Sequence, residues 1–168
     1  RHLSRVEAFE AGTEQPLPCL KVGKNRFRVE APGDTRIELR YRVYAHELSV
    51  RTADVDSCHA YWNHCCVLLW PLAQTDLPAD ITIEHLKDWS LSCSLAATPA
   101  RANALGCVAS TLRARDLAEA LDSPVLIGST KRLEWQVHGV PHAIVLDGLG
   151  SVAPPPSLTT DLTKIVEQ

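Results

Sequence analysis

The chain has 168 residues, of which 45% are hydrophobic and 22% are charged, and its formal net charge is −3. This length is typical of one globular domain with a substantial core. The small net charge gives no basis for a nucleic acid or an anionic membrane as a partner. No apolar run reaches the roughly 20 residues of a membrane-spanning helix. We therefore expect a cytoplasmic protein with no nucleic-acid partner and no membrane partner.

The first part of the chain is predicted to form short strands joined by turns. Strands are expected at residues 3–9, 19–22, 25–31 and 35–51. The clearest pattern lies in the last of these, where Ile37, Leu39, Tyr41 and Val43 alternate with charged residues. A period of two is typical of a strand with one buried face and one solvated face.

The remainder of the chain continues mainly as strands. The apolar run His59–Trp70 is interpreted as a central strand buried on both faces, and further strands are expected at residues 78–86, 90–97, 131–137 and 141–146. Residues 98–109 are interpreted as a loop, and residues 113–121 as a helix. After the proline-rich stretch Pro154–Pro156, apolar residues at helical spacing predict a terminal helix.

These elements predict an all-β fold, an antiparallel β-sandwich with one short internal helix and a C-terminal linker helix. The sandwich is expected to span residues 1–150, and the linker and helix residues 151–168. Six cysteines lie in the chain, several of them in apolar strand contexts. We interpret them as reduced thiols, because a chain of this length does not depend on disulfides for its stability.

Several segments spread over the chain resemble one family, the N-terminal domain of the M61, or glycyl aminopeptidase, zinc metallopeptidases. The most specific are Tyr41–Asp56 (YRVYAHELSVRTADVD) and Arg115–Gly128 (RDLAEALDSPVLIG). The other matching segments are Arg1–Val6, HAYWN at His59–Asn63, Asp88-Trp89, Gly139–Gly148 and the closing TTDLTKIVEQ. The family commonly has glycine after the asparagine of HAYWN, where this chain has His64.

The resemblance implies a larger parent protein. Members of the family usually continue into a thermolysin-like zinc domain and a PDZ domain, so this chain is expected to be a fragment. The implied partners are the catalytic domain of the parent chain and a peptide substrate. Zinc is expected in that catalytic domain, and no cofactor is expected in this chain. By analogy with the related M1 aminopeptidases, a substrate contact would come from the stretch around His59–Asn63.

Zinc hydrolysis requires two histidines one helical turn apart with a neighbouring carboxylate, as in the H-E-x-x-H motif. His46-Glu47 begins this motif, but Val50 stands where the second histidine would be. The parent is therefore expected to be a zinc metallopeptidase, an aminopeptidase, whereas this chain alone is predicted to be inactive.

The densest group of metal-ligand types is Cys58, His59, His64, Cys65 and Cys66. Its spacing matches no C-x-x-C pair. If the run is a strand, Cys65 and Cys66 point to opposite faces and do not chelate together. A cysteine nucleophile paired with His59 or His142 is the other chemistry that these residue types allow.

Tyr61, Trp62 and Asn63 are the candidate substrate-binding residues, because an amide flanked by aromatic rings suits a peptide backbone or its amino end. The alternative interpretation is a core strand with one hydrogen-bonded asparagine. A second hypothesis for the whole chain is a stand-alone β-sandwich module that binds a peptide or protein. If the opening strands of the family pattern are missing, a homodimer through an exposed sheet edge is also expected.

Overall fold

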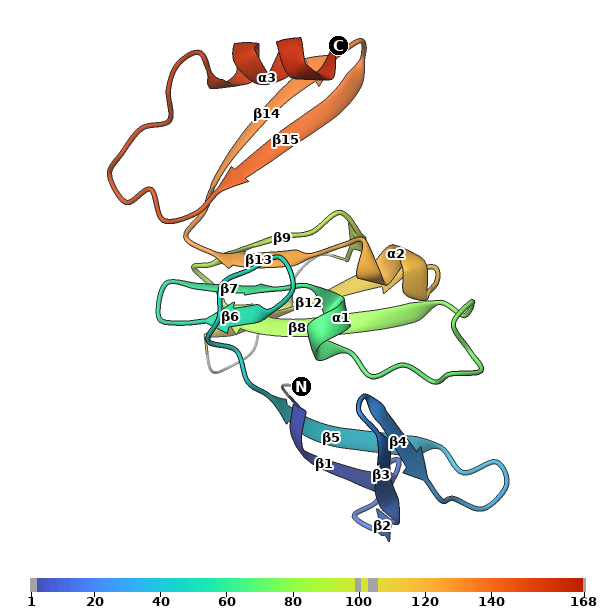
Figure 1. Cartoon of the computed structure of the whole chain (residues 1–168). Coiled ribbons are helices and arrows are strands. Elements are labelled where there is room, and N and C mark those ends of the chain that lie inside the picture. The colour runs from blue at the N-terminus through green and yellow to red at the C-terminus, as the bar shows by residue number, and fades with distance from the viewer. Residues whose placement is uncertain (1–2, 99–100, 103–105, 168) are drawn as a thin grey trace. The chain divides into compact units, whose positions relative to one another are not determined.

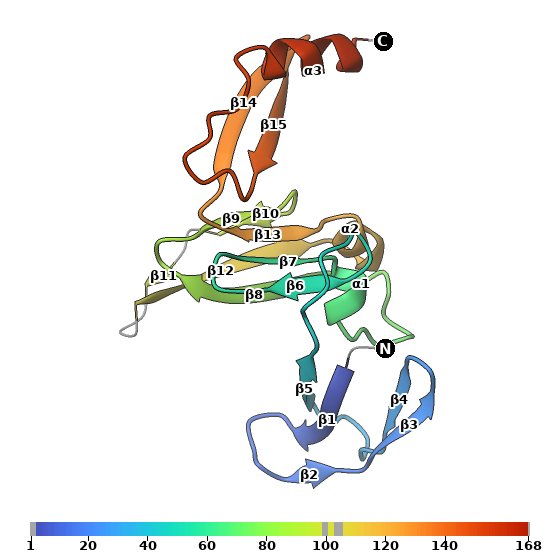
Figure 2. The same cartoon turned by 60° about the vertical axis from the view of Figure 1, so that its left-hand side comes forward.

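The computed structural model describes residues 3–98, 101–102 and 106–167 and contains several antiparallel sheets with short helices. Strands make up 47% of it and helices 11%, so the all-β prediction is confirmed. The chain divides into two compact units, Arg1–Glu47 and Leu48–Gln168. Figures 1 and 2 show the elements of each unit from two directions. The boundary at residue 150 between the domain and its linker stays a prediction.

Unit 1 contains a three-stranded sheet and a hairpin. In the sheet, β1 (Leu3–Glu10) pairs antiparallel with both β2 (Pro16–Leu17) and β5 (Ile37–Val43). The hairpin joins β3 (Cys19–Gly23) to β4 (Arg26–Val29). Ala8 in β1 is buried, directly opposite Leu17 and Leu39. Leu39, Tyr41 and Val43 on β5 are partly buried, as their alternation predicts, whereas Ile37 is 46% exposed.

Unit 2 is built on two antiparallel sheets. In the first sheet, the strand order is β6 (Ala53–Val55), β7 (His59–Trp62), β13 (Val125–Gly128) and β9 (Ser90–Ser92). In the second, β12 (Cys107–Ala114) pairs with β8 (Ala79–Leu86) and with the short strands β10 (Ala96–Ala97) and β11 (Arg101–Ala102).

The hydrophobic core of unit 2 lies between these sheets. Ala60 and Ile127 come from the first sheet, and Ile83 and Leu112 come from the second. Trp62, Trp70, Trp89 and Leu91 pack against this cluster and are partly buried. Two sheets that share one apolar core form a sandwich, so each strand directs alternate side chains inward.

Three short helices and one long hairpin complete unit 2. The helices are α1 (His64–Val67), α2 (Leu117–Leu121) and α3 (Leu158–Val166). The hairpin pairs β14 (Lys131–Val137) with β15 (Val140–Leu146), and α3 lies against β14 (Figure 1). His138 and Gly139 form the two-residue turn with φ of 50° and 79°, the left-handed values that such a turn requires. Within the described residues, none of these helices has the length and apolar character to cross a bilayer.

Several predicted elements differ from the structure. The strand expected at residues 35–51 is shorter, because β5 ends at Val43. The apolar run His59–Trp70 is not one strand, because β7 ends at Trp62 and the chain turns into α1. Residues 98–109 are not only loop: they include β11 and the start of β12, which pairs with β8 over eight residues. Because Arg113 and Ala114 belong to β12, the predicted internal helix begins only at Leu117.

Gly128 is expected to be intolerant of a side chain. A Cβ atom placed on it would lie 2.9 Å from the carbonyl oxygen of Cys58 and 3.2 Å from Cβ of His59. The obstructing atoms are mainly backbone of the adjacent strand, so Gly128→Ala should destabilise unit 2 by about 1–3 kcal/mol. Denaturant unfolding measures this value. Gly23→Ala is the control, since its nearest contact would be an ordinary 3.6 Å; equal effects of the two substitutions would contradict the argument.

Candidate functional site

Strand β7 divides its side chains between the two faces of the first sheet. Ala60 belongs to the core cluster and Trp62 packs against it. Since successive strand residues point to opposite faces, His59 and Tyr61 face away from that core. The candidate site therefore comprises this outer face of β7 together with the start of α1.

Tyr61 lines a hollow of about 360 Å³, here called the Tyr61 pocket. Its walls come from β7, β9, β13 and the β14–β15 hairpin. They are formed by Tyr61, Ser92, Cys93, Ser94, Pro124, Val125, Leu126, Arg132, Ala143 and Val145. A volume of this size is at the lower end of small-molecule sites, and a phenol and a guanidinium are its longest polar side chains.

Two polar side chains of the Tyr61 pocket have hydrogen-bond partners within the chain. Arg132 donates from Nε to Glu134 at 2.6 Å, and Ser94 donates to Ser123 at 2.8 Å. Burial raises the pKa of the Cys93 thiol, so this sulfur is held in its neutral form at neutral pH. With a neutral Cys93 thiol and internally paired Arg132 and Ser94 side chains, the pocket suits binding better than nucleophilic attack.

Trp62 and Asn63 have structural partners. The indole Nε1–H of Trp62 donates to Nδ1 of His64 at 3.3 Å. The side chain of Asn63 accepts a hydrogen bond from the backbone N–H of Cys65 at 3.0 Å and caps α1. Of the three predicted substrate-binding residues, the structure places only Tyr61 in the wall of the Tyr61 pocket. Their role in substrate binding stays a prediction.

Loss of the Asn63 cap is expected to be measurable. Asn63→Ala should lower the free energy of unfolding by about 1 kcal/mol, because the Cys65 N–H loses its acceptor. Asn63→Ser should retain most of the stability, since serine is also a good cap. Chemical denaturation of the three proteins gives these differences. Equal losses in both variants would show that the amide contributes through another contact.

His59 joins two distant segments of unit 2. Its Nε2 lies 3.1 Å from Oδ2 of Asp54 on β6, and its Nδ1 lies 3.0 Å from Oδ2 of Asp147, which follows β15. The imidazole side chain is only 13% exposed. It can donate to both carboxylates only when both ring nitrogens carry a proton. This arrangement, here called the His59 bridge, connects the β6–β7 hairpin with the end of the β14–β15 hairpin.

The sequence interpretation did not anticipate the His59 bridge. His59 was weighed there as a metal-ligand type, as a partner for a cysteine and as the start of the stretch expected to contact substrate, and neither Asp54 nor Asp147 was considered. The β6–β7 hairpin brings Asp54 beside His59, whereas Asp147 arrives through long-range folding. No local pattern around Asp147 indicates that contact.

The predicted cluster of cysteines and histidines is separated by the fold. His64 is fully buried, and His59 belongs to its own bridge. The expectation that Cys65 and Cys66 point to opposite faces is wrong, because both residues lie in α1 and their sulfurs are 3.6 Å apart. Within residues 3–98, 101–102 and 106–167, no group of three or more His, Cys, Asp and Glu side chains is arranged to hold a metal ion.

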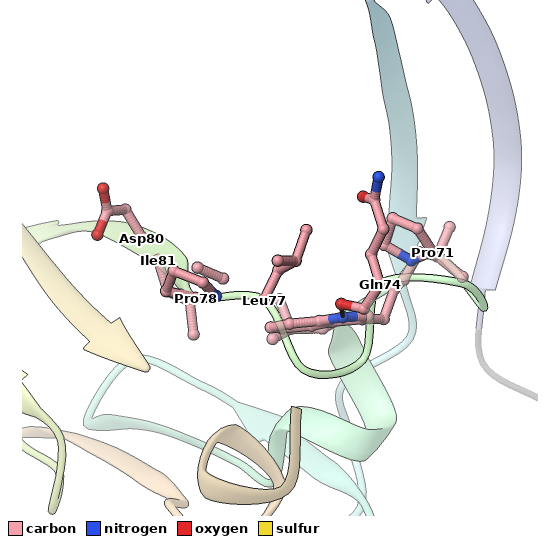
Figure 3. Close-up of a pocket in the computed structure, with 10 residues that line it drawn as sticks. Pro71, Gln74, Leu77, Pro78, Asp80 and Ile81 are labelled. Carbon is pink, nitrogen blue, oxygen red and sulfur yellow. Dashed lines mark hydrogen bonds between the residues drawn. The ribbon is translucent and has the colours of Figure 1, made fainter. Parts of the chain in front are cut away.

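A second hollow of about 290 Å³ lies along the segment from Leu68 to Ile81. Figure 3 shows Pro71 and Gln74 on one side of Leu77, and Pro78, Asp80 and Ile81 on the other. Within it, the indole N–H of Trp70 donates to the carbonyl oxygen of Gln74 at 2.8 Å. Asp80 accepts from Arg113 at 2.7 Å. This hollow is lined mainly by apolar side chains of one chain segment.

The family model described as the Peptidase M61 N-terminal domain matches residues 1–129, which run from the start of the chain through β13. The chain belongs to this family. The resemblance inferred from the sequence is therefore confirmed.

Two solved structures are similar to this M61 N-terminal domain. It is similar to the crystal structure of an aminopeptidase N family protein from Idiomarina loihiensis, with a TM-score of 0.81 and 29% identity, covering 99% of this chain and 27% of that chain. It also resembles a two-domain M1 zinc metallopeptidase bound to L-arginine, with a TM-score of 0.54 and 14% identity, covering 98% of this chain and 42% of that one. The second likeness concerns the fold alone. No curated protein matches the chain.

Both comparisons cover the M61 N-terminal domain almost completely but cover less than half of the matched proteins. The likeness to the Idiomarina protein includes the β14–β15 hairpin and α3, which lie outside residues 1–129. These elements therefore form part of the shared fold, together with β1–β13.

Proposed function

We propose that this chain is the non-catalytic N-terminal domain of an M61-like zinc metallo-aminopeptidase. It braces the catalytic domain of the parent protein and shapes the cleft that receives the peptide substrate. Zinc and the groups that activate water belong to that catalytic domain. This chain supplies a rigid wall and no reacting group.

One observation carries the proposal. Nearly the whole chain aligns with just over a quarter of an aminopeptidase N family protein, at 29% identity. The family match assigns residues 1–129 to the Peptidase M61 N-terminal domain. The sandwich core between two sheets makes this domain stiff enough to hold a surface in place against a neighbouring domain.

Tyr61 is the residue that we propose for contact with substrate. It lies on the outer face of β7 and lines the Tyr61 pocket, so its ring and hydroxyl are available to a ligand there. Trp62 and Asn63 would then act indirectly: Trp62 holds β7 on the core, and Asn63 fixes the start of α1. A peptide amino end is the expected ligand class, since the matched proteins include aminopeptidases.

An activity assay tests the non-catalytic role. The purified chain, incubated with zinc and supplied with aminoacyl reporter substrates, is expected to show no turnover above buffer. The same assay on a full-length enzyme of the family is the positive control. Turnover by the isolated chain that a chelator abolishes would overturn the proposal.

We also expect self-association through a sheet edge of unit 2. The edge strands β6 and β9 have three residues each, and Val55 on β6 is 48% exposed. Such short edge strands limit pairing with another chain, so the eight-residue edge strand β8, which pairs with β12 on one side, is the expected contact. Light scattering over a concentration series checks this, and a monomer at every concentration would contradict it.

A further inference from the structure

The sulfur atoms of Cys65 and Cys66 are 3.6 Å apart on α1. Consider two sulfurs that bind the same central atom at about 2.3 Å, the usual zinc–sulfur length. When the sulfur–atom–sulfur angle is pyramidal or tetrahedral, the two sulfurs lie roughly 3.5–3.8 Å apart. The observed separation therefore already fits one atom shared by both thiols. We propose that Cys65 and Cys66 form a two-thiol site for trivalent arsenicals.

A disulfide between these neighbours is disfavoured. Disulfides usually join residues whose Cα atoms are 4.4–6.8 Å apart, whereas adjacent residues across a trans peptide are about 3.8 Å apart. The Cys65–Cys66 peptide bond is not cis. A single arsenic atom bonded to both sulfurs avoids this constraint, because the two sulfurs then stay near their present separation and form no direct bond to each other.

Zinc and similar ions suit this site less well. Zinc in proteins usually takes three or four protein ligands, and the described part of the chain has no such group of side chains here. The neighbouring His64 is fully buried, with Nδ1 occupied by the Trp62 N–H. An organic trivalent arsenical carries its own carbon ligand and needs only two sulfurs from the protein. Soft thiols are the ligands that such a soft centre prefers.

The two thiols are held differently. Cys65 is exposed, whereas Cys66 is partly buried and donates its S–H to the carbonyl oxygen of Arg51 at 2.8 Å. Burial is the main factor that raises the pKa of Cys66, to about 11, so it is a neutral thiol at neutral pH. We expect Cys65 to react first and Cys66 to close the ring.

The chemistry balances without any oxidant. With phenylarsine oxide, the two S–H bonds break and two sulfur–arsenic bonds form. The arsenic-bound oxygen leaves as one water molecule that takes both protons. Arsenic stays trivalent, and each sulfur keeps its oxidation state.

Intact-mass measurement on the reduced full chain tests the site. One equivalent of phenylarsine oxide should give one adduct that survives an excess of a monothiol and is removed by a small dithiol. Cys65→Ser and Cys66→Ser should each lower, at least tenfold, the fraction of protein that still carries the adduct after treatment with the monothiol. Cys58→Ser, which removes another exposed thiol, should leave it unchanged.

Serine at position 66 retains a donor for the Arg51 carbonyl, so this variant is expected to fold; circular dichroism verifies that each variant does. Two results would overturn the proposal. One is the absence of any monothiol-resistant adduct on the unmodified chain. The other is an adduct on a folded Cys65→Ser or Cys66→Ser protein that resists excess monothiol as well as the adduct on the unmodified chain does. This result would mean that other cysteines bind the arsenical.

Discussion

Leu112→Ala is expected to lower the free energy of unfolding of unit 2 by about 2–5 kcal/mol. Leu112 is fully buried on β12, directly opposite Ile81 on β8 and Ala97 on β10. Its side chain fills the space between the two sheets, so alanine leaves a cavity that the paired backbones cannot close. Denaturant unfolding measures the loss as a lower transition midpoint with an unchanged slope.

Leu86→Ala is the matched control for this prediction. Leu86 lies on β8 in the same strand pair but is 51% exposed, opposite Cys107. Its removal should cost about 1 kcal/mol or less, because most of its surface stays in water. Equal losses for the two leucines would show that the space between the sheets is not the core of this unit.

The second large effect is a loss of stability in mild acid that depends on His64. This side chain is fully buried, and burial lowers its pKa below the usual value of 6.5. Its Nδ1 accepts the Trp62 N–H, and protonation there would break this hydrogen bond. His64 is therefore held neutral in the folded protein, whereas in the unfolded chain it takes up a proton near pH 6.5.

The direction of the pH dependence follows from the proton count. Between the lowered pKa of His64 in the folded protein and about pH 6.5, the unfolded chain binds more protons than the folded protein does. The free energy of unfolding therefore rises with pH in that window. The His64 contribution is complete above pH 6.5 and is lost as the pH falls, by up to about 1.4 kcal/mol per pH unit. Unfolding free energies measured from pH 7.5 to 5 check the slope.

His64→Gln isolates this effect. Glutamine offers an acceptor to Trp62 but does not titrate, so the variant should lose the acid-dependent part of the slope. His138→Asn is the control, since His138 is exposed in the β14–β15 turn and asparagine tolerates its positive φ. An unchanged slope in His64→Gln would mean that another group titrates on unfolding.

Much of the fold was predictable because most strands carry their own pattern. β1, β8, β14 and β15 alternate apolar and polar residues or are bounded by turn residues, and they lie close to where the sequence predicts them. β12 was not anticipated, since Gly106 and Pro99 are loop signals and its small residues give little alternation. Its position is decided by pairing with β8 over eight residues, which is a tertiary effect.

The start of α1, at the candidate site, also could not be predicted from the local sequence pattern. His59–Trp70 is apolar enough for a long strand, but the Asn63 side chain captures the Cys65 N–H and starts a helix. Periodicity does not distinguish a buried strand from a short helix in such a run. That single turn brings the Cys65 and Cys66 sulfurs together. The His59 bridge was likewise hidden, because Asp147 is 88 positions away in the sequence.

The most direct test of the proposed supporting role is the kcat/KM of the parent catalytic domain, produced separately, with and without this chain. We predict that addition of the folded chain raises kcat/KM for an aminoacyl substrate at least tenfold, and that Tyr61→Ala in the added chain reduces this gain. A catalytic domain that is equally active without the chain would contradict the account.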